Sequence, residues 1–310
     1  MRIATIDIGT NTTLLLVADV QAGQATVLCE RAEITRLGRG IGGGKILGQT
    51  GIQATLAVLA DYRKLADELE APLFAIGTEG LRRAGNAAEF LAPAATVLGA
   101  PVEVIDGDRE AALTFLAARR AFPVESEGSL VVIDIGGGST EIIVSKGAAI
   151  AFRRSLPLGS VRLTERHVAH DPPLPGEIAA VRAEIQTLLE PIPFPDEPAL
   201  LVGTAGTVTT LAAMDQELRD YDPGLVHGYH LSRERLAAQI ARLTTADQAM
   251  RETMAGLDPR RADVILAGAC LLDLIAQKAR SPHVLVSDRG IRWGLLFEKA
   301  ERLAAGPLHR

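Results

Sequence analysis

An internal repeat is the feature that most restricts how this chain can fold. Residues 3–17 read IATIDIGTNTTLLLV, residues 130–144 read LVVIDIGGGSTEIIV, and the two segments align without a gap. Each copy contains an apolar run, an aspartate, a turn rich in small residues and a second apolar run, which predicts a β-hairpin. Two copies of one hairpin predict two similar domains, each opening with that hairpin.

The remaining segments alternate between patterns typical of strands and of helices. Apolar residues at helical spacing over 51–70 predict an amphipathic helix. Within 101–122, a strand and an acidic turn precede a helix that Asp106 or Asp108 is expected to cap. Further elements are expected at 71–81 (a strand, then a loop), 176–190 (a helix), 200–214 (a strand, a glycine loop, then a helix), 260–279 (a long helix) and 283–304 (a strand, a turn, then a helix). This alternation predicts α/β domains with mainly parallel sheets and helices outside them.

Composition and charge limit the classes of function. The 310 residues suffice for about two domains. The formal net charge of -6 disfavours a general nucleic-acid binder, although clustered arginines can still create a positive potential in a cleft. No apolar run approaches the roughly 18 residues of a membrane helix, and no signal peptide is recognisable, so we expect a cytoplasmic protein. Cys29 and Cys270 lack a metal or redox spacing and are expected to be buried thiols.

Loops of small residues follow several of the predicted strands. The residues expected to bind phosphate in them are Thr10, Asn11, Gly136, Gly137, Gly138, Ser139, Gly203, Thr204, Gly206 and Thr207. Loops without bulky side chains let backbone N–H groups approach phosphate oxygens, and a helix that follows adds its positive end. One such loop is usually a tight turn, but three loops, two of them related by the repeat, favour phosphate binding.

The two hairpins differ at one informative position. Both copies keep an aspartate, at Asp7 and Asp134, but Glu141 stands where the first copy has Leu14. Carboxylates beside a phosphate loop suit Mg²⁺, usually through water, so Asp7, Asp134 and Glu141 are predicted metal residues. The alternative for the two aspartates is turn capping, which is common.

Motifs along almost the whole chain resemble the exopolyphosphatase/guanosine pentaphosphate phosphohydrolase family, in its short two-domain form. The matching segments are DIGTNTTLLLV (7–17), RLGRGI (36–41), GTEGLRRA (77–84), DGDREAALTF (106–115), VIDIGGGSTE (132–141), GTAGT (203–207), HGYHLS (227–232), RADVILAG (261–268) and VSDRGIRWGLL (286–296). The sequence also resembles the wider superfamily of acetate and sugar kinases, chaperone ATPases and actin. Two residues depart from the family pattern: Trp293, where an acidic residue is frequent, and Asp106, where many members have serine.

The resemblance implies a fold and site roles. It implies two actin-like (ribonuclease H-like) α/β domains, 1–123 and 124–293, with an interdomain phosphate-binding cleft and a last helix, 294–310, that packs back on the first domain. It implies that Glu110 is the general base for an attacking water. Glu141 would be the second carboxylate, and Arg82 would hold the phosphate chain.

The implied activity is Mg²⁺-dependent exopolyphosphatase, with Mn²⁺ as an alternative metal and orthophosphate as the product. Guanosine pentaphosphate is the alternative substrate. A kinase-type phosphotransferase and a non-catalytic polyphosphate or nucleotide sensor are more distant alternatives; Glu110 and Glu141 argue against the sensor. We expect no nucleic-acid or membrane partner, and a homodimer is left open.

Overall fold

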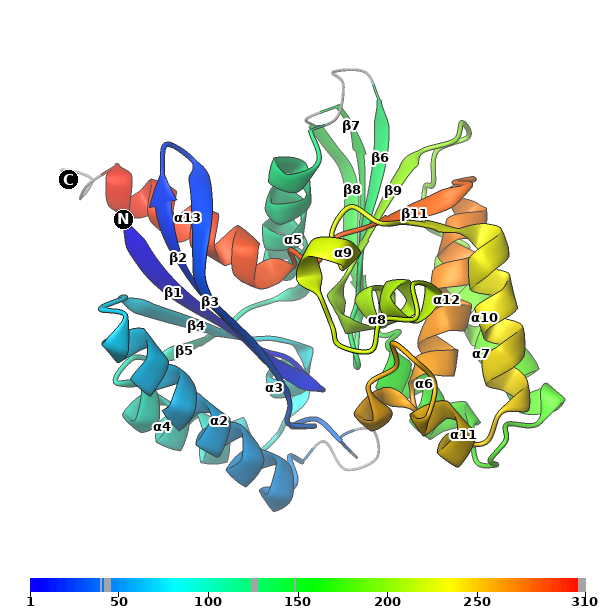
Figure 1. Cartoon of the computed structure of the whole chain (residues 1–310), viewed down its shortest axis with the longest axis horizontal. Coiled ribbons are helices and arrows are strands. Elements are labelled where there is room, and N and C mark those ends of the chain that lie inside the picture. Colours follow the sequence, from blue (N-terminus) through cyan, green and yellow to red (C-terminus); the bar gives the residue numbers. More distant parts are fainter. Residues whose placement is uncertain (40, 42–45, 124–127, 148, 306–310) are drawn as a thin grey trace. The chain divides into compact units, whose positions relative to one another are not determined.

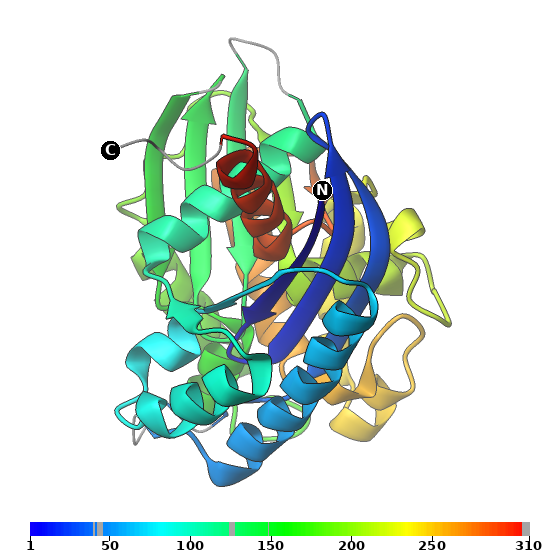
Figure 2. The ribbon, with the colours of Figure 1, turned by 90° about the vertical axis from the view of Figure 1, so that its left-hand side faces the viewer.

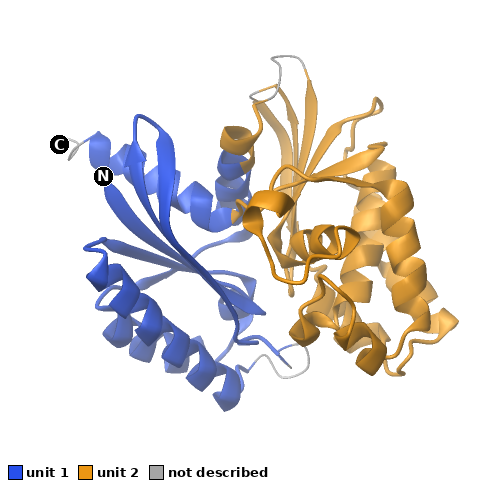
Figure 3. Cartoon of the chain, viewed as in Figure 1, with its two compact units in different colours: residues 1–117, 291–310 blue, residues 118–290 orange. Residues whose placement is uncertain are grey.

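The computed structural model describes residues 1–39, 41, 46–123, 128–147 and 149–305 (Figure 1). The chain divides into two compact units, Met1–Ala117 with Ile291–Arg310 (unit 1) and Ala118–Gly290 (unit 2) (Figure 3). Their first boundary lies inside helix α5 (Gly107–Ala121), earlier than the boundary between residues 123 and 124 that the resemblance implied. Residues 124–127 lie outside the described residues.

Unit 1 is built on a five-stranded sheet of order β3-β2-β1-β4-β5. Its strands are β1 (Arg2–Ile8), β2 (Thr12–Gln21), β3 (Gln24–Ile34), β4 (Leu73–Gly77) and β5 (Val102–Val104). The predicted hairpin is present as the antiparallel pair β1–β2, in which Asp7 lies opposite Leu14. Strands β4 and β5 continue the sheet in parallel with β1, so the carboxyl ends of β1 and β4 lie at one edge.

Helices cover both faces of this sheet. They are α2 (Gln49–Glu68), α3 (Glu79–Arg83), α4 (Ala87–Leu98), the first part of α5, and α13 (Ile291–Ala304). Side chains alternate along a strand. Ile6 and Leu15 therefore pack in one core with α2 and α4, while Ile3 and Leu16 pack in another with α13. Figure 2 shows α13 (red) lying along the blue strands β1 and β2.

Unit 2 contains a six-stranded sheet of order β10-β11-β9-β6-β7-β8. Its strands are β6 (Ser129–Ile135), β7 (Thr140–Lys146), β8 (Ala149–Leu156), β9 (Leu200–Thr204), β10 (His230–Ser232) and β11 (His283–Val286). The second predicted hairpin is the antiparallel pair β6–β7.

The helices of unit 2 share one large core with its sheet. They are α6 (Ser160–His167), α7 (Pro175–Leu189), α8 (Ala205–Asp215), α9 (Pro223–Val226), α10 (Arg233–Thr245), α11 (Gln248–Glu252), the 3₁₀ turn η1 (Pro259–Arg261) and α12 (Ile265–Lys278). Helix α12 is buried from Ile265 to Ala276 because α6, α7, α8 and α10 pack around it.

Three details of the sequence prediction are wrong. Both sheets are mixed rather than mainly parallel, because each hairpin and the strand after it pair antiparallel. The segment after β4 is the short helix α3 instead of a loop. The predicted helix 260–279 begins only at Ile265, because Asp258 caps a separate 3₁₀ turn that starts at Pro259.

Candidate active site

The two hairpin turns have the same backbone arrangement. The Gly9 N–H donates to the Thr12 carbonyl oxygen, and the Gly136 N–H donates to the Ser139 carbonyl oxygen, at 3.0 Å in both cases. A Cβ on either glycine would lie 3.0–3.1 Å from that same oxygen, so both turns favour glycine at their first position. The repeat seen in the sequence is therefore also a repeat of hydrogen bonding.

In unit 2 the carbonyl groups of the glycine turn all bond to the start of α6. The Ser160 N–H donates to Gly136 O and the Arg162 N–H to Gly137 O, both at 3.0 Å. Arg162 Nε donates to Gly138 O at 2.7 Å. A carbonyl oxygen repels a phosphate, whereas an N–H group attracts one. Because residues at the start of α6 donate hydrogen bonds to these carbonyl oxygens, the groups of the turn that remain for an anion are N–H groups.

Unit 1 holds its turn in a related way. The Arg36 N–H donates to Asn11 O at 2.9 Å, and the Gly38 N–H donates to Thr10 O at 2.8 Å. The dipeptide Leu-Gly therefore occurs in both units, as Leu37-Gly38 and as Leu158-Gly159. Each of these glycines lies close to the turn of its own unit. The sequence comparison missed this second repeat because two residues give too short a signal. Gly40, within the predicted segment 36–41, lies outside the described residues.

Asn11 is a candidate phosphate ligand on physical grounds. Its side chain is buried, and its amide Nδ2 has no hydrogen-bond partner among the described residues. A buried amide donor without an acceptor is costly, so an anionic oxygen at this position would be favourable. Thr10 is also buried, and its hydroxyl donates to Glu79 Oε2 at 3.5 Å. Glu79 in turn accepts a hydrogen bond from Arg83 Nη1 at 3.1 Å. Glu79 is a buried carboxylate that sequence reasoning did not single out.

The predicted carboxylates of unit 2 lie side by side. Asp134 on β6 is opposite Glu141 on β7 and in register with Thr204 on β9. Residues paired in this way project from one face of the sheet. Glu141 is 1% exposed and accepts hydrogen bonds from Ser139 Oγ at 3.0 Å and Ser155 Oγ at 2.7 Å. The Ser139 hydroxyl therefore donates to Glu141, and the predicted binding of phosphate by this residue, which rests on the backbone N–H groups of its loop, stays a prediction.

Helix α8 begins directly after Thr204 and supplies the third loop. No side chain caps the helix, so the backbone N–H groups of its first turn remain for an anion. Ala205, the first helical residue, has a φ of 69°, a conformation that costs free energy for any residue except glycine. Such strain is found where a site fixes the backbone.

The predicted residues of this loop differ in what they face. Gly203 serves packing, because a Cβ there would lie 2.9 Å from methyl groups of Val208 and Val284. Thr207 is buried, with its side chain against Gly268 of α12. Gly203 and Thr207 can therefore contribute backbone N–H groups to phosphate binding, but not side chains.

Arg261 packs its guanidinium against Gly206, so closely that a Cβ on Gly206 would overlap it. Burial lowers the pKa of Arg261, and Asp258 opposes that shift. The guanidinium nevertheless stays charged at neutral pH. The sequence placed Arg261 in a family segment without a role, and only the fold brings it to the α8 loop.

Glu110 and Arg82 meet in unit 1. Glu110 lies in the first turn of α5. Asp106, the residue immediately before this helix, accepts the Arg109 N–H at 2.8 Å and so caps the helix, as predicted. Glu110 is 7% exposed, so it is not the solvated first-turn glutamate that helix statistics favour. Arg82 Nη1 donates to Glu110 Oε2 and to the Ile105 carbonyl oxygen, each at 2.8 Å.

The donor set fits a hard cation such as Mg²⁺. Asp134 and Glu141 offer carboxylate oxygens beside the Thr204 hydroxyl, which is the chemistry that Mg²⁺ prefers. In the described residues, no cluster of three or more His, Cys, Asp or Glu side chains could hold a metal ion. Mg²⁺ commonly takes one or two carboxylates and completes its shell with water and phosphate oxygens. Asp7 lies in unit 1, at the end of β1, and its predicted role in metal binding stays a prediction.

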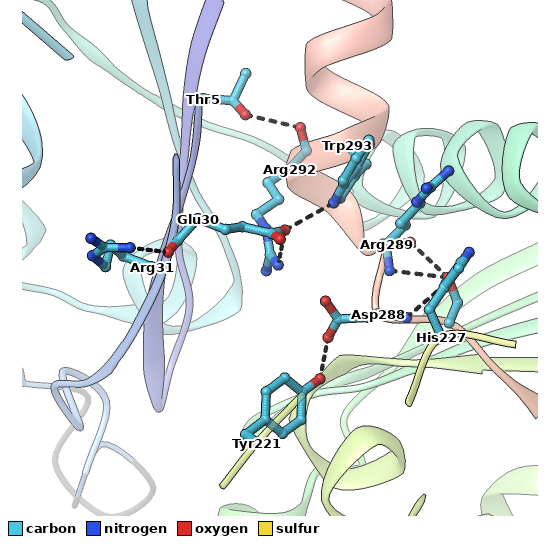
Figure 4. Close-up of polar contacts among 10 residues, drawn as sticks. Thr5, Glu30, Arg31, Tyr221, His227, Asp288, Arg289, Arg292 and Trp293 are labelled. Carbon is cyan, nitrogen blue, oxygen red and sulfur yellow. Dashed lines mark hydrogen bonds and ion pairs between the residues drawn. The ribbon is translucent and has the colours of Figure 1, made fainter. Parts of the chain in front are cut away.

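The segment 286–296 is anchored by polar contacts within each unit. In unit 1, Glu30 accepts from Arg292 Nη2 at 2.6 Å and from Trp293 Nε1 at 3.2 Å (Figure 4). In unit 2, Tyr221 donates to the Asp288 carboxylate, and the Asp288 N–H donates to His227 Nδ1 at 3.3 Å. The unusual Trp293 thus has a local hydrogen-bond acceptor.

Comparison with known proteins gives matches over most of the chain. Residues 16–303 match the Ppx/GppA phosphatase family. The chain is 36% identical to exopolyphosphatase 2 of Mycobacterium tuberculosis, over 96% of this chain and 98% of that protein. The crystal structure of the Aquifex aeolicus member of the Ppx/GppA family has a TM-score of 0.83 at 33% identity, covering 100% of this chain and 99% of the other. An exopolyphosphatase structure from Cytophaga hutchinsonii has a TM-score of 0.89 at 27% identity, covering 97% and 98%.

Proposed function

We propose that this chain, which belongs to the Ppx/GppA phosphatase family, is an exopolyphosphatase that releases orthophosphate from the end of inorganic polyphosphate. The family and the fold class of two actin-like α/β domains, both predicted from the sequence, are confirmed by the family match and by the solved relatives. The observation that carries the proposed chemistry is the buried Glu110 carboxylate held by Arg82.

The proposed reaction is hydrolysis of the terminal phosphoanhydride bond. The oxygen of a water molecule forms a bond to the terminal phosphorus, and its proton passes to Glu110. The bond from that phosphorus to the bridging oxygen breaks, and the shortened chain leaves with the electron pair. Arg82 and the N–H groups of the β1–β2 turn, both in unit 1, neutralise the phosphoryl oxygens, and such neutralisation is most of the catalysis that phosphoryl transfer requires.

Asp134 and Glu141 would hold Mg²⁺, or Mn²⁺ in its place, directly or through water. The ion would supply further neutralisation of the phosphate oxygens. Ser139 and Ser155 hold the Glu141 carboxylate in one orientation for that purpose.

A substrate panel tests the proposal. Orthophosphate release is measured with short polyphosphate, long polyphosphate, guanosine pentaphosphate and ATP, each with Mg²⁺ and after exhaustive chelation. We expect release from polyphosphate, loss of that release on chelation, and a fall of about 10² to 10⁴-fold in turnover for Glu110→Gln.

Each other outcome has a defined meaning. Preference for guanosine pentaphosphate over every polyphosphate would replace the substrate and keep the chemistry. ATP formation when ADP is added would indicate a phosphotransferase. Near-normal turnover of Glu110→Gln would refute its role as the base, and full activity after chelation would refute the metal assignment.

A further inference from the structure

Arg251 of α11 is a buried arginine to which the proposed reaction assigns no task. Its side chain is 4% exposed. Nε donates a hydrogen bond to the Leu243 carbonyl oxygen at 3.1 Å, and Nη1 donates to the Ala262 carbonyl oxygen at 3.2 Å. Nη2 lies 3.6 Å from Oδ1 of Asp171, in the segment between α6 and α7. One guanidinium therefore joins the end of α10, the segment before α7 and the residue that follows η1.

A buried charge at this position is costly, so its contacts need an explanation. Burial lowers the pKa of Arg251 and Asp171 opposes that shift, and the guanidinium stays charged at neutral pH. Nη2 is buried and, within the described residues, has no hydrogen-bond partner. An apolar side chain of similar size would often fill such a site at a lower cost in free energy. What an apolar side chain could not supply is directed N–H donors to two backbone carbonyl groups.

The contact with Ala262 matters because of the residue next to it. Ala262 directly follows Arg261, the last residue of η1, whose guanidinium packs against Gly206 in the loop that opens α8. On the other side of Arg261, its N–H donates to the Asp258 carbonyl oxygen at 2.8 Å. The bond from Arg251 to the Ala262 carbonyl oxygen therefore fixes the backbone from which the Arg261 side chain departs.

The segment from α11 to η1 contacts both ends of α8. Gly256 lies between α11 and η1 with a φ of 79°, and a Cβ on it would overlap the carbonyl group of Ala213 near the end of α8. At the other end of α8, the Arg261 guanidinium lies against Gly206. Arg251 is thus a buried polar anchor at the start of a segment that is fitted along this helix.

We propose that Arg251 is a positioning residue for the phosphate loop of α8 (residues 203–207): by holding the Ala262 carbonyl group, it keeps the Arg261 charge at the amino end of that helix. This inference rests on the proposed function, in which the loop binds phosphate. Arg251 acts through Arg261 and is not itself a phosphate ligand, because its own donors face two carbonyl groups and Asp171. Without this hold, η1 can shift and take the charge away from the N–H groups of the loop.

A double-mutant cycle tests the proposal. KM and kcat for a short polyphosphate, and calorimetric binding of orthophosphate, are measured for Arg251→Met in the Arg261 and in the Arg261→Met background. With Arg261 present, Arg251→Met should raise KM and weaken orthophosphate binding by about tenfold, a coupling usual for residues of one network. The fall in kcat should stay within about threefold, because Glu110 and Arg82 lie in unit 1 and are unchanged. In the Arg261→Met background, the same substitution should change KM and binding by no more than about twofold.

Two further variants separate positioning from general stability. Arg182→Met is the matched control in unit 2, since it removes the arginine that donates to the buried Asp273 carboxylate at 2.7 and 3.0 Å. It should lower the melting temperature as Arg251→Met does, but leave KM and orthophosphate binding unchanged. Arg251→Lys keeps the charge and can still donate to the Ala262 carbonyl oxygen, so it should recover part of the lost affinity. If Arg251→Met does not fold, Arg251→Lys is carried through the same cycle.

Equal effects of the Arg251 substitution in both backgrounds would overturn its action through Arg261. Unchanged KM and unchanged orthophosphate binding in a folded Arg251→Met would reduce Arg251 to a purely structural residue. Absence of polyphosphate hydrolysis by the wild-type chain would instead refute the proposed function, and the orthophosphate measurements would still report on the coupling of the two arginines.

Discussion

Gly159 shows how a residue without a side chain can control the anion-binding property of a loop. It precedes α6, and a Cβ at this position would overlap the carbonyl group of Gly137 in the glycine turn. The close approach allows Ser160 and Arg162 to bond the turn's carbonyl groups. Displacing α6 would release those oxygens toward the side where phosphate is expected to bind.

Gly159→Ala should therefore lower kcat/KM for polyphosphate by on the order of 10²-fold, because the turn that binds phosphate is misplaced. It should also cost about 1–3 kcal/mol of stability as an overpacked site. The matched control is Gly176→Ala in the same unit, where nothing lies within 4 Å of the added Cβ. Chemical denaturation and steady-state kinetics measure both effects, and equal behaviour of the two variants would contradict the assigned role of Gly159.

Residues also show where sequence reasoning stops. The small-residue turns and the difference between Leu14 and Glu141 could be predicted because each is a local pattern or a direct alignment. The contact of Arg261 with Gly206, and the pairing of Arg82 with Glu110, join segments far apart in the chain. No periodicity encodes such contacts; they depend on how the helices pack. Ser139 was predicted as a phosphate ligand from its turn, and the turn gave no sign that its hydroxyl also donates to Glu141.

At the scale of elements, α13 is held to the sheet of unit 1 by both apolar and polar contacts. Leu296 and Phe297 pack on the β1–β2 face, and the Thr5 hydroxyl donates to the Arg292 carbonyl oxygen at 3.0 Å. Glu30 on β3 binds the side chains of Arg292 and Trp293 (Figure 4). The strand and the helix could each be predicted from the sequence. Their joining by Glu30 could not, because glutamate on an edge strand usually faces solvent.

Glu30→Ala should destabilise unit 1 by about 2 kcal/mol. The buried Arg292 guanidinium loses a charged partner, and the cost is below the roughly 3–5 kcal/mol of fully buried pairs because Glu30 is 22% exposed. Trp293 is the single tryptophan of the chain, so urea unfolding followed by its fluorescence reports on this element. Asp19→Ala, which breaks the more exposed pair with Arg2, should cost less stability than Glu30→Ala. A smaller loss for Glu30→Ala than for Asp19→Ala would show that α13 is held by its apolar contacts alone.

At the scale of the whole molecule, each unit has its own buried core. Leu59 lies in the core between α2 and the sheet of unit 1, and Leu243 lies in the core of unit 2; both are fully buried. Within the described residues, no helix is long and apolar enough to cross a membrane. The internal repeat correctly predicted two domains that each contain one copy of the hairpin. The exact boundary could not be predicted, because it falls inside the continuous helix α5.

Separate cores predict separate responses to damage. Leu243→Ala should cost about 2–5 kcal/mol and raise hydrogen exchange in β6 and α12 while β1 and β2 keep their protection. Leu59→Ala should give the reverse pattern. Exchange measured by mass spectrometry on peptides of both units tests this, and uniform loss of protection in either variant would mean that the units unfold as one.

The paired turns also record a history. Both copies keep the glycine, the aspartate and the hydrogen bond that closes the turn, whereas only one has acquired a glutamate opposite its aspartate. Duplication gives a gene two equal halves, and a half that is spare can change without loss to the organism. The contrast between Leu14 and Glu141 is one such difference, since the same position of the hairpin is apolar in one copy and acidic in the other.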